Sequence, residues 1–191
     1  MKPAKAMDVE AALDLRVDPV AEADEYRQML LGVLGDRDPA NAQAEFPDRL
    51  SAAIEGVDRT LLRTKPKPNE WSALEILGHI LDAEIVLAGR YRWILAHDEP
   101  PLVGYDQDRW IERLHHPHED PQERLALFRA LRQANLGLWQ RTSGADRARV
   151  GIHSERGSES YELSFRLLAG HDLFHLGQLR RTLDQVTGRP G

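Results

Sequence analysis

The chain has 191 residues, of which 29% are charged and 41% hydrophobic, and its formal net charge is −6. This length suits one domain with a single core, and the composition is typical of a globular protein. The negative charge argues against nucleic-acid binding, and no apolar run approaches the roughly 20 residues that span a bilayer. Since no hydrophobic stretch follows the first two lysines, a secretory signal is not indicated either. We therefore expect a cytoplasmic protein with neither nucleic acid nor membrane as a partner.

The N-terminal region shows the weakest pattern. Residues 1–19 have little periodicity and predict a poorly ordered tail, followed by one helical domain over 20–188. A first helix is expected from Val20 to about Leu34, because apolar residues recur there at helical spacing and Gly35 follows. A second helix is expected from about Pro47 to Leu62.

The next helix has the clearest start signal in the chain. Ser72-x-x-Glu75 is a capping box, and no breaker follows until Pro100, so a helix is predicted from Ser72 to about His97. This helix is apolar on more than one side, as is typical of a central helix with several neighbours. His79 therefore lies in apolar company, where a histidine needs a partner.

The second half of the chain predicts two more long helices. After a short helix near 106–114, Asp120-Pro121 indicates the start of a helix that extends to about Arg141. A loop rich in glycine and serine covers 145–160, and a last helix is expected from Tyr161 to about Val186, ended by Gly188. No segment shows a convincing strand pattern.

These elements predict an all-α protein: a four-helix bundle with an extra N-terminal helix. About two dozen residues separate the helix at 72–97 from the helix at 121–141. Such a length permits a long crossover connection, so these two helices need not be antiparallel neighbours.

Three histidines are candidate metal ligands. His171 and His175 are four residues apart, so they lie on one helix face with Cβ atoms about 6 Å apart and can bind one cation. His79, on the central helix, is the best third ligand, since bundles commonly build metal sites from inward residues of facing helices. The alternative is that these are three unrelated buried histidines, each with its own hydrogen bond. The residues alone leave both interpretations open.

Other polar residues lie near these histidines in the predicted arrangement. Asp82 and Gln178 are candidates to orient a histidine or a substrate, and His153 could fold over the site from its loop. For each of them an ordinary surface or packing role is the alternative. Arg90 shares the helix face of His79. It could be buried in an ion pair, or it could bind an anion in a pocket. The cluster His115, His116 and His118 lies in a link, where no fixed scaffold for a metal is expected.

Three segments together resemble one known family. The residues that carry the resemblance are Trp71-Ser72-x-x-Glu75-x-x-x-His79-x-x-Asp82-x-Glu84, Pro100-Pro101 with Tyr105-Asp106-Gln107-Asp108, and His171-Asp172-x-x-His175-x-x-Gln178. In order and spacing they resemble the DinB/YfiT-like superfamily, the damage-inducible metalloproteins rather than the polymerase of the same name. The resemblance covers about residues 20–186. It implies a four-helix bundle, a divalent metal (zinc or nickel foremost) on His79, His171 and His175, and a homodimer.

The resemblance also implies a chemistry. Characterised members of the family include transferases that use a low-molecular-weight thiol, and three neutral imidazoles leave a metal an open position, as in catalytic sites. The chain has no cysteine, so a thiol would have to come from a small molecule. We therefore expect a metal-dependent S-transferase that uses such a thiol on a small-molecule substrate. The alternatives are a hydrolase in which the same metal activates water, and a non-catalytic module that binds a metal or small ligand.

Overall fold

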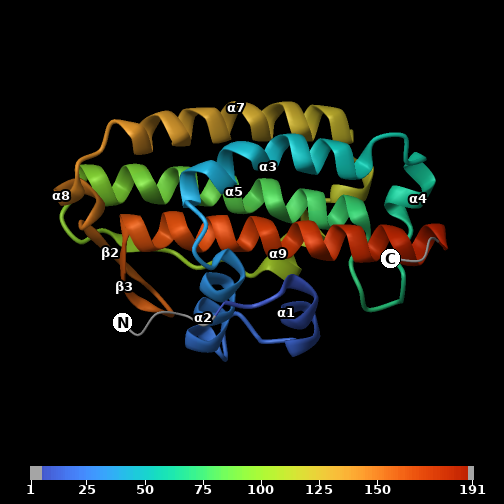
Figure 1. Cartoon of the computed structure of the whole chain (residues 1–191), viewed down its shortest axis with the longest axis horizontal. Coiled ribbons are helices and arrows are strands. Elements are labelled where there is room, and N and C mark those ends of the chain that lie inside the picture. The colour runs from blue at the N-terminus through green and yellow to red at the C-terminus, as the bar shows by residue number, and fades with distance from the viewer. Residues whose placement is uncertain (1–5, 189–191) are drawn as a thin grey trace.

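The computed structural model describes residues 6–188 and is dominated by four long helices that lie side by side (Figure 1). These are α3 (Pro39–Ile54), α5 (Ala73–Ala96), α7 (Pro121–Gln140) and α9 (Tyr161–Thr187). The shorter α2 (Ala23–Leu34) packs against α9 outside the bundle. The predicted all-α four-helix bundle with an extra N-terminal helix is confirmed. None of the described helices is long and apolar enough to cross a membrane.

The order of the helices requires a long crossover. The colours of Figure 1 show that α5 and α7 run in the same direction, so the link between them returns along the whole bundle. This link carries β1 (Pro101–Leu102), α6 (Gln107–Arg113) and a 3₁₀ turn, η1 (His116–His118). The other connections hold α4 (Arg59–Arg63) and α8 (Gly144–Arg147). The crossover that the sequence permitted is therefore present, and α5 and α7 pack as parallel neighbours.

A small sheet closes one end of the molecule, where no strand was expected. β2 (Val150–His153) and β3 (Gly157–Ser160) form an antiparallel hairpin, and β1 pairs in parallel with β2, with Leu102 opposite His153. Strands of two to four residues are too short to show a periodic pattern, so sequence reasoning missed them. The hairpin matters for the site because it holds His153 in a fixed position.

Most helix starts follow the predicted capping chemistry. The capping box of Ser72 and Glu75 is formed in both directions, and Asp120 accepts hydrogen bonds from the backbone at the start of α7. α3 also has such a cap, Asp38 followed by Pro39, and ends at Ile54, but its predicted start was wrong. Pro47, taken as the helix start from sequence, lies inside α3. Two helices therefore replace the single predicted helix of 47–62: α3, which starts earlier, and the separate α4.

The prediction of a poorly ordered tail is wrong for residues 8–16. Asp8 caps a helix, α1 (Val9–Leu15), whose Ala12 is only 1% exposed. Arg181 of α9 forms ion pairs with Glu10 and Asp14 of this helix. A helix of seven residues gives too little periodicity to be recognised, and its contacts with α9 stabilise it instead. Residues 1–5 lie outside the described part of the chain.

The interior of the bundle changes character along its length. One end is mainly aliphatic, with Phe46 and Phe128 as its buried aromatic residues. The other end is rich in aromatic residues, with Tyr91, Trp139 and Tyr161 packed together. Between the two ends lies a layer of buried polar residues from α5, α7 and α9. The members of this layer are His79, Asp82, Glu84, Arg132, His171, Asp172 and His175. Burial of so many polar groups in one layer is costly and indicates a site.

Candidate metal centre and adjoining pocket

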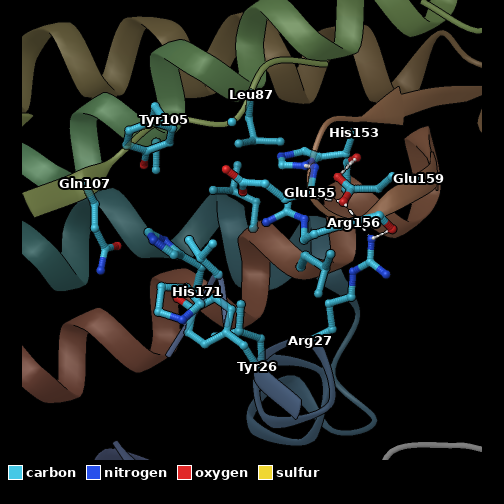
Figure 2. A pocket seen from close by; sticks show the side chains of 18 of the residues that line it. Tyr26, Arg27, Leu87, Tyr105, Gln107, His153, Glu155, Arg156, Glu159 and His171 are labelled. Carbon is cyan, nitrogen blue, oxygen red and sulfur yellow. Dashed lines mark hydrogen bonds and ion pairs between the residues drawn. The ribbon is translucent and has the colours of Figure 1, made fainter. Parts of the chain in front are cut away.

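A pocket of about 420 Å³ lies beside this polar layer. Its walls come from α2, α5, α9, the link before α6 and the β2–β3 hairpin. Figure 2 shows His171 on one side and His153, Glu159 and Arg156 on the other. Apolar residues line the space between, among them Leu30, Leu87, Leu167 and Leu168. The pocket therefore joins a histidine-lined end to an arginine-lined end, and its volume is in the range of small-molecule sites.

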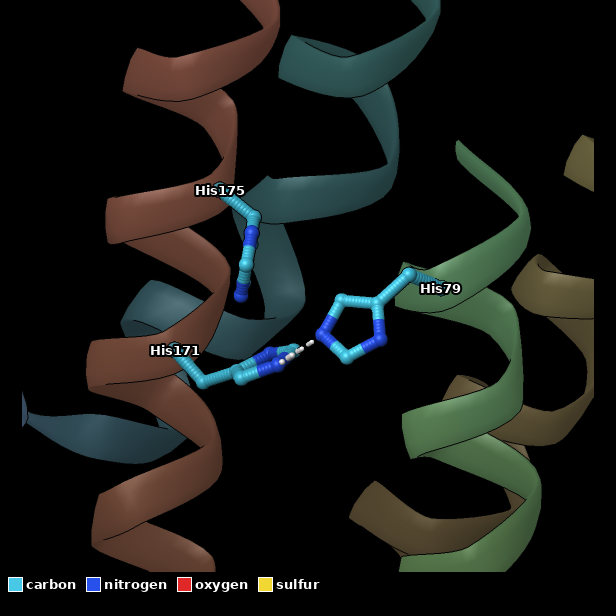
Figure 3. Close-up of side chains that lie close together, drawn as sticks. All are labelled: His79, His171 and His175. Carbon is cyan, nitrogen blue, oxygen red and sulfur yellow. Dashed lines mark hydrogen bonds between the residues drawn. The ribbon is translucent and has the colours of Figure 1, made fainter. Parts of the chain in front are cut away.

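Three histidines converge at the first of these ends. His171 and His175 project from α9 toward His79 of α5 (Figure 3), and their exposed fractions are 8%, 4% and 2%. One ring nitrogen of each lies within 4.8 Å of the others, and the Nε2 atoms of His79 and His171 are 3.0 Å apart. The structure thus brings together the three residues that the sequence singled out.

The proton positions on His175 follow from its partner. Its Nδ1 is 2.7 Å from Oε1 of Gln178, and an amide oxygen only accepts, so Nδ1 carries the proton. Nε2 is then a free lone pair, and it is buried with no hydrogen-bond partner among the described residues. Since an unpaired buried acceptor is costly, a cation is a fitting partner for this nitrogen. Gln178 therefore lies where it can orient the ring of a candidate ligand.

Burial keeps the three imidazoles neutral. It lowers the pKa of His175 to about 4, and the Gln178 hydrogen bond opposes this effect only in part. Burial, followed by the neighbouring charge of His175, lowers the pKa values of His79 and His171 well below the usual value. Neutral imidazole is the form that binds metal ions, so the site needs no deprotonation at pH 7.

The donor set fits a divalent transition metal. Three imidazole nitrogens suit zinc, nickel, copper or iron, whereas calcium and magnesium prefer oxygen ligands. No carboxylate joins this three-histidine cluster within the described chain. Three protein ligands leave a fourth position open, as in catalytic rather than structural zinc sites.

The remaining candidates lie in different places. Asp82 does not face the cluster, because its Oδ2 accepts a hydrogen bond from Nε2 of His116 at 2.8 Å. His153 lines the same pocket as His79 but lies at the arginine end, with Nε2 3.1 Å from Nη2 of Arg90. Asp82 thus supports the crossover link, and His153 belongs to the wall opposite the histidines.

Two structural residues near the site were missed from the sequence. His116 is 1% exposed and packs against Gly78, so the link around it does have a fixed scaffold, contrary to expectation. Trp71 covers the cluster, with its ring centroid 5.1 Å from that of His79 and 6.4 Å from that of His175. Its place directly before the capping box was the available signal, since that box fixes the start of the helix that carries His79.

Comparison with known proteins decides the family. The family model of the DinB superfamily matches residues 42–179, which include all three histidines. The chain belongs to the DinB superfamily. This confirms the resemblance that the sequence motifs indicated.

Curated relatives of this DinB protein carry one kind of name. A protein of Geobacillus thermodenitrificans (strain NG80-2) is 29% identical over 68 residues, which are 36% of this chain and 38% of the relative. A protein of Bacillus mycoides (strain KBAB4) is 21% identical over 135 residues, 71% of this chain and 78% of the relative. The names of both assign them provisionally to the metal-dependent hydrolases.

A solved structure has the same fold. YfiT from Bacillus subtilis aligns with a TM-score of 0.72 at 20% identity over 91% of each chain. It is described as a probable metal-dependent hydrolase with an unusual four-helix bundle topology. At this identity the likeness establishes the fold alone.

Proposed function

We propose that this DinB protein is a metal-dependent enzyme acting on a small organic molecule, with His79, His171 and His175 as ligands of one divalent cation. The observation that carries the proposal is the convergence of three buried, neutral imidazoles beside an open pocket. The unpaired Nε2 of His175 is the most specific support, because no described residue satisfies it. A cation held there would supply a Lewis acid that lowers the pKa of a water or thiol nucleophile.

For the nucleophile we propose a low-molecular-weight thiol, which makes the protein an S-transferase. The chain has no cysteine of its own. A second pocket of about 540 Å³ adjoins the histidines on the side of His175 and Gln178, and Tyr26 and Gln107 line both pockets. Two pockets that adjoin one histidine cluster suit a reaction of two organic substrates.

The second candidate is hydrolysis, in which water replaces the thiol. The observation that favours it is the shared hydrolase name of the curated relatives. The same three ligands and the same pocket would serve this reaction. A single assay separates the two candidates: turnover of a panel of electrophilic substrates with and without small thiols. Turnover that requires the thiol and leaves its sulfur in the product supports transfer, whereas turnover in water alone supports hydrolysis.

Metal ligation is tested by His175→Ala. We expect purified wild-type protein to contain about one divalent metal per chain by elemental analysis. Loss of a residue that only hydrogen-bonds a metal ligand typically weakens metal binding roughly 10–100-fold. Loss of the ligand itself in His175→Ala should weaken metal binding by more than this, and activity should be lost together with the metal. His118→Ala is the control, because His118 is exposed and outside the cluster. Full activity in metal-free protein would refute the proposal, and tight metal binding without turnover would leave a non-catalytic binding module.

The oligomer is a further part of the proposal. Family resemblance implies a homodimer, and light scattering on the purified chain measures its mass directly. A mass of about 43 kDa, twice that of the 21.6 kDa chain, would support it, and a monomer would refute it.

A further inference from the structure

Arg90 is a buried arginine in the same pocket as the histidines. It lies eleven residues after His79 on α5, which is three helical turns and about 16 Å along the same face. Its side chain is 3% exposed and lines the pocket at the end away from the cluster. Because helical side chains lean toward the N-terminus, the guanidinium lies closer to His79 than its Cα does.

The guanidinium of Arg90 contacts only neutral groups. Its Nη2 donates to the carbonyl oxygen of Val103 at 2.6 Å and lies 3.1 Å from Nε2 of His153. Its Nε is buried without a hydrogen-bond partner, and no described carboxylate forms an ion pair with it. Buried charges in proteins are normally paired by direct contact, and Arg90 has no such contact with a carboxylate of the described residues.

The one buried carboxylate of the pocket is already engaged. Glu159, 1% exposed, accepts a hydrogen bond from Ser164 at 2.6 Å. Its Oε2 pairs with Arg156 at 3.1 Å and with Arg27 at 3.5 Å. Three guanidinium groups, of Arg27, Arg90 and Arg156, therefore line this end of the pocket with one buried carboxylate, and the second carboxylate there, Glu155, is exposed. Burial and then the charge of Arg156 lower the pKa of Arg90, and the more distant carboxylates of Glu159 and Glu155 oppose this shift.

We propose that the pocket binds a small organic carboxylate, whose anionic group pairs with Arg90 while its other end reaches the three histidines. A guanidinium presents paired N–H donors that match a carboxylate. The aliphatic wall formed by Leu30, Leu87 and Leu167 suits an apolar body between the two ends. This assignment names the substrate class for the proposed function. Only the contact of the ligand's far end with the three histidines rests on that function.

The test compares a carboxylate with its neutral amide. Hexanoate and hexanamide are titrated into the full-length protein by ligand-observed NMR, with metal and after its removal by a chelator. A charge-assisted hydrogen bond should make hexanoate bind about tenfold more tightly or better. We expect wild-type protein to prefer hexanoate both with and without metal. This preference should vanish in Arg90→Gln and should largely persist in Arg90→Lys. Arg92→Gln is the matched control, because the exposed Arg92 lies on the same helix outside the pocket.

Several outcomes would overturn the proposal. Equal binding of the two compounds to wild-type protein, or no hexanoate binding at millimolar concentration, would do so without any variant. A preference that survives Arg90→Gln, or that disappears with the metal, would place the carboxylate elsewhere. Tighter binding of hexyl phosphate than of hexanoate would reassign the pocket to phosphates. An Arg90-dependent preference in a protein that binds no metal would support the anion site while refuting the proposed enzyme.

Discussion

At the scale of single residues, Arg132 shows how the polar layer is stabilised. Its side chain is 1% exposed, and its guanidinium bonds Oε2 of Glu84 at 2.7 Å and Oδ2 of Asp172 at 2.6 Å. Asn135 completes the network by donating to the other oxygen of Glu84. Asp172 directly follows His171, so this network holds the helix segment that carries the histidine. The side chains come from three helices, α5, α7 and α9.

Arg132→Met should destabilise the fold strongly. It leaves two carboxylates buried without a cation, and breaking a buried ion pair costs about 3–5 kcal/mol. Denaturant unfolding monitored by circular dichroism measures the change. Arg129→Met on the same helix is the control, because its pair with Asp48 is exposed and should contribute at most about 1 kcal/mol. Equal losses in the two variants would contradict this account.

At the scale of elements, the approach of α2 to α9 depends on one glycine. A Cβ atom at Gly170 would lie 2.2 Å from the carbonyl oxygen of Leu30, so no side chain fits between these helices. Gly170 precedes His171, and Leu30 lines the pocket. The close packing of the extra helix therefore shapes the wall next to the cluster.

Gly170→Ala should push α2 away from α9. Overpacking of this kind costs about 1–3 kcal/mol, even though alanine favours a helix over glycine by about 1 kcal/mol. Gly137→Ala in α7 is the comparison, since its Cβ would meet only the flexible end of the Arg141 side chain at 3.2 Å. Thermal unfolding should show a lower midpoint for the first variant and an equal or higher midpoint for the second. A stabilised Gly170→Ala would mean that α2 is free to move.

At the scale of the whole molecule, the histidine cluster connects two helices that are far apart in sequence. His79 and His171 are 92 positions apart, and a cation shared between them would link α5 to α9 across the bundle. A ligand that binds only the folded state stabilises it by mass action.

Zinc should therefore raise the unfolding midpoint of metal-free protein. At a free metal concentration about 1,000 times the Kd, the gain is about 4 kcal/mol. His79→Ala should lose most of this gain, because the variant removes the ligand from α5. His118→Ala should keep it, and a shift of equal size in both variants would show that zinc binds elsewhere.

Local chemistry accounts for what was predictable. The capping boxes, the proline and glycine stops and the helical spacing of apolar residues each act within a few residues, so most helix starts were correct. The four-residue spacing of His171 and His175 and the apolar neighbours of His79 are equally local. The sequence by itself therefore determined α2, the four long helices apart from the start of α3, and the three candidate ligands.

Only the tertiary structure decided how distant segments meet. The burial of His116 against Gly78, the pairing of Arg132 with Glu84 and Asp172, and the short strands all depend on contacts between residues far apart in the chain. α1 is likewise stabilised by α9 rather than by its own pattern. The role of Arg90 stayed open for the same reason: its sequence position shows the helix face, but only packing reveals that no carboxylate of the described residues forms an ion pair with it. Such contacts are set by the energy of the whole fold, which no local pattern records.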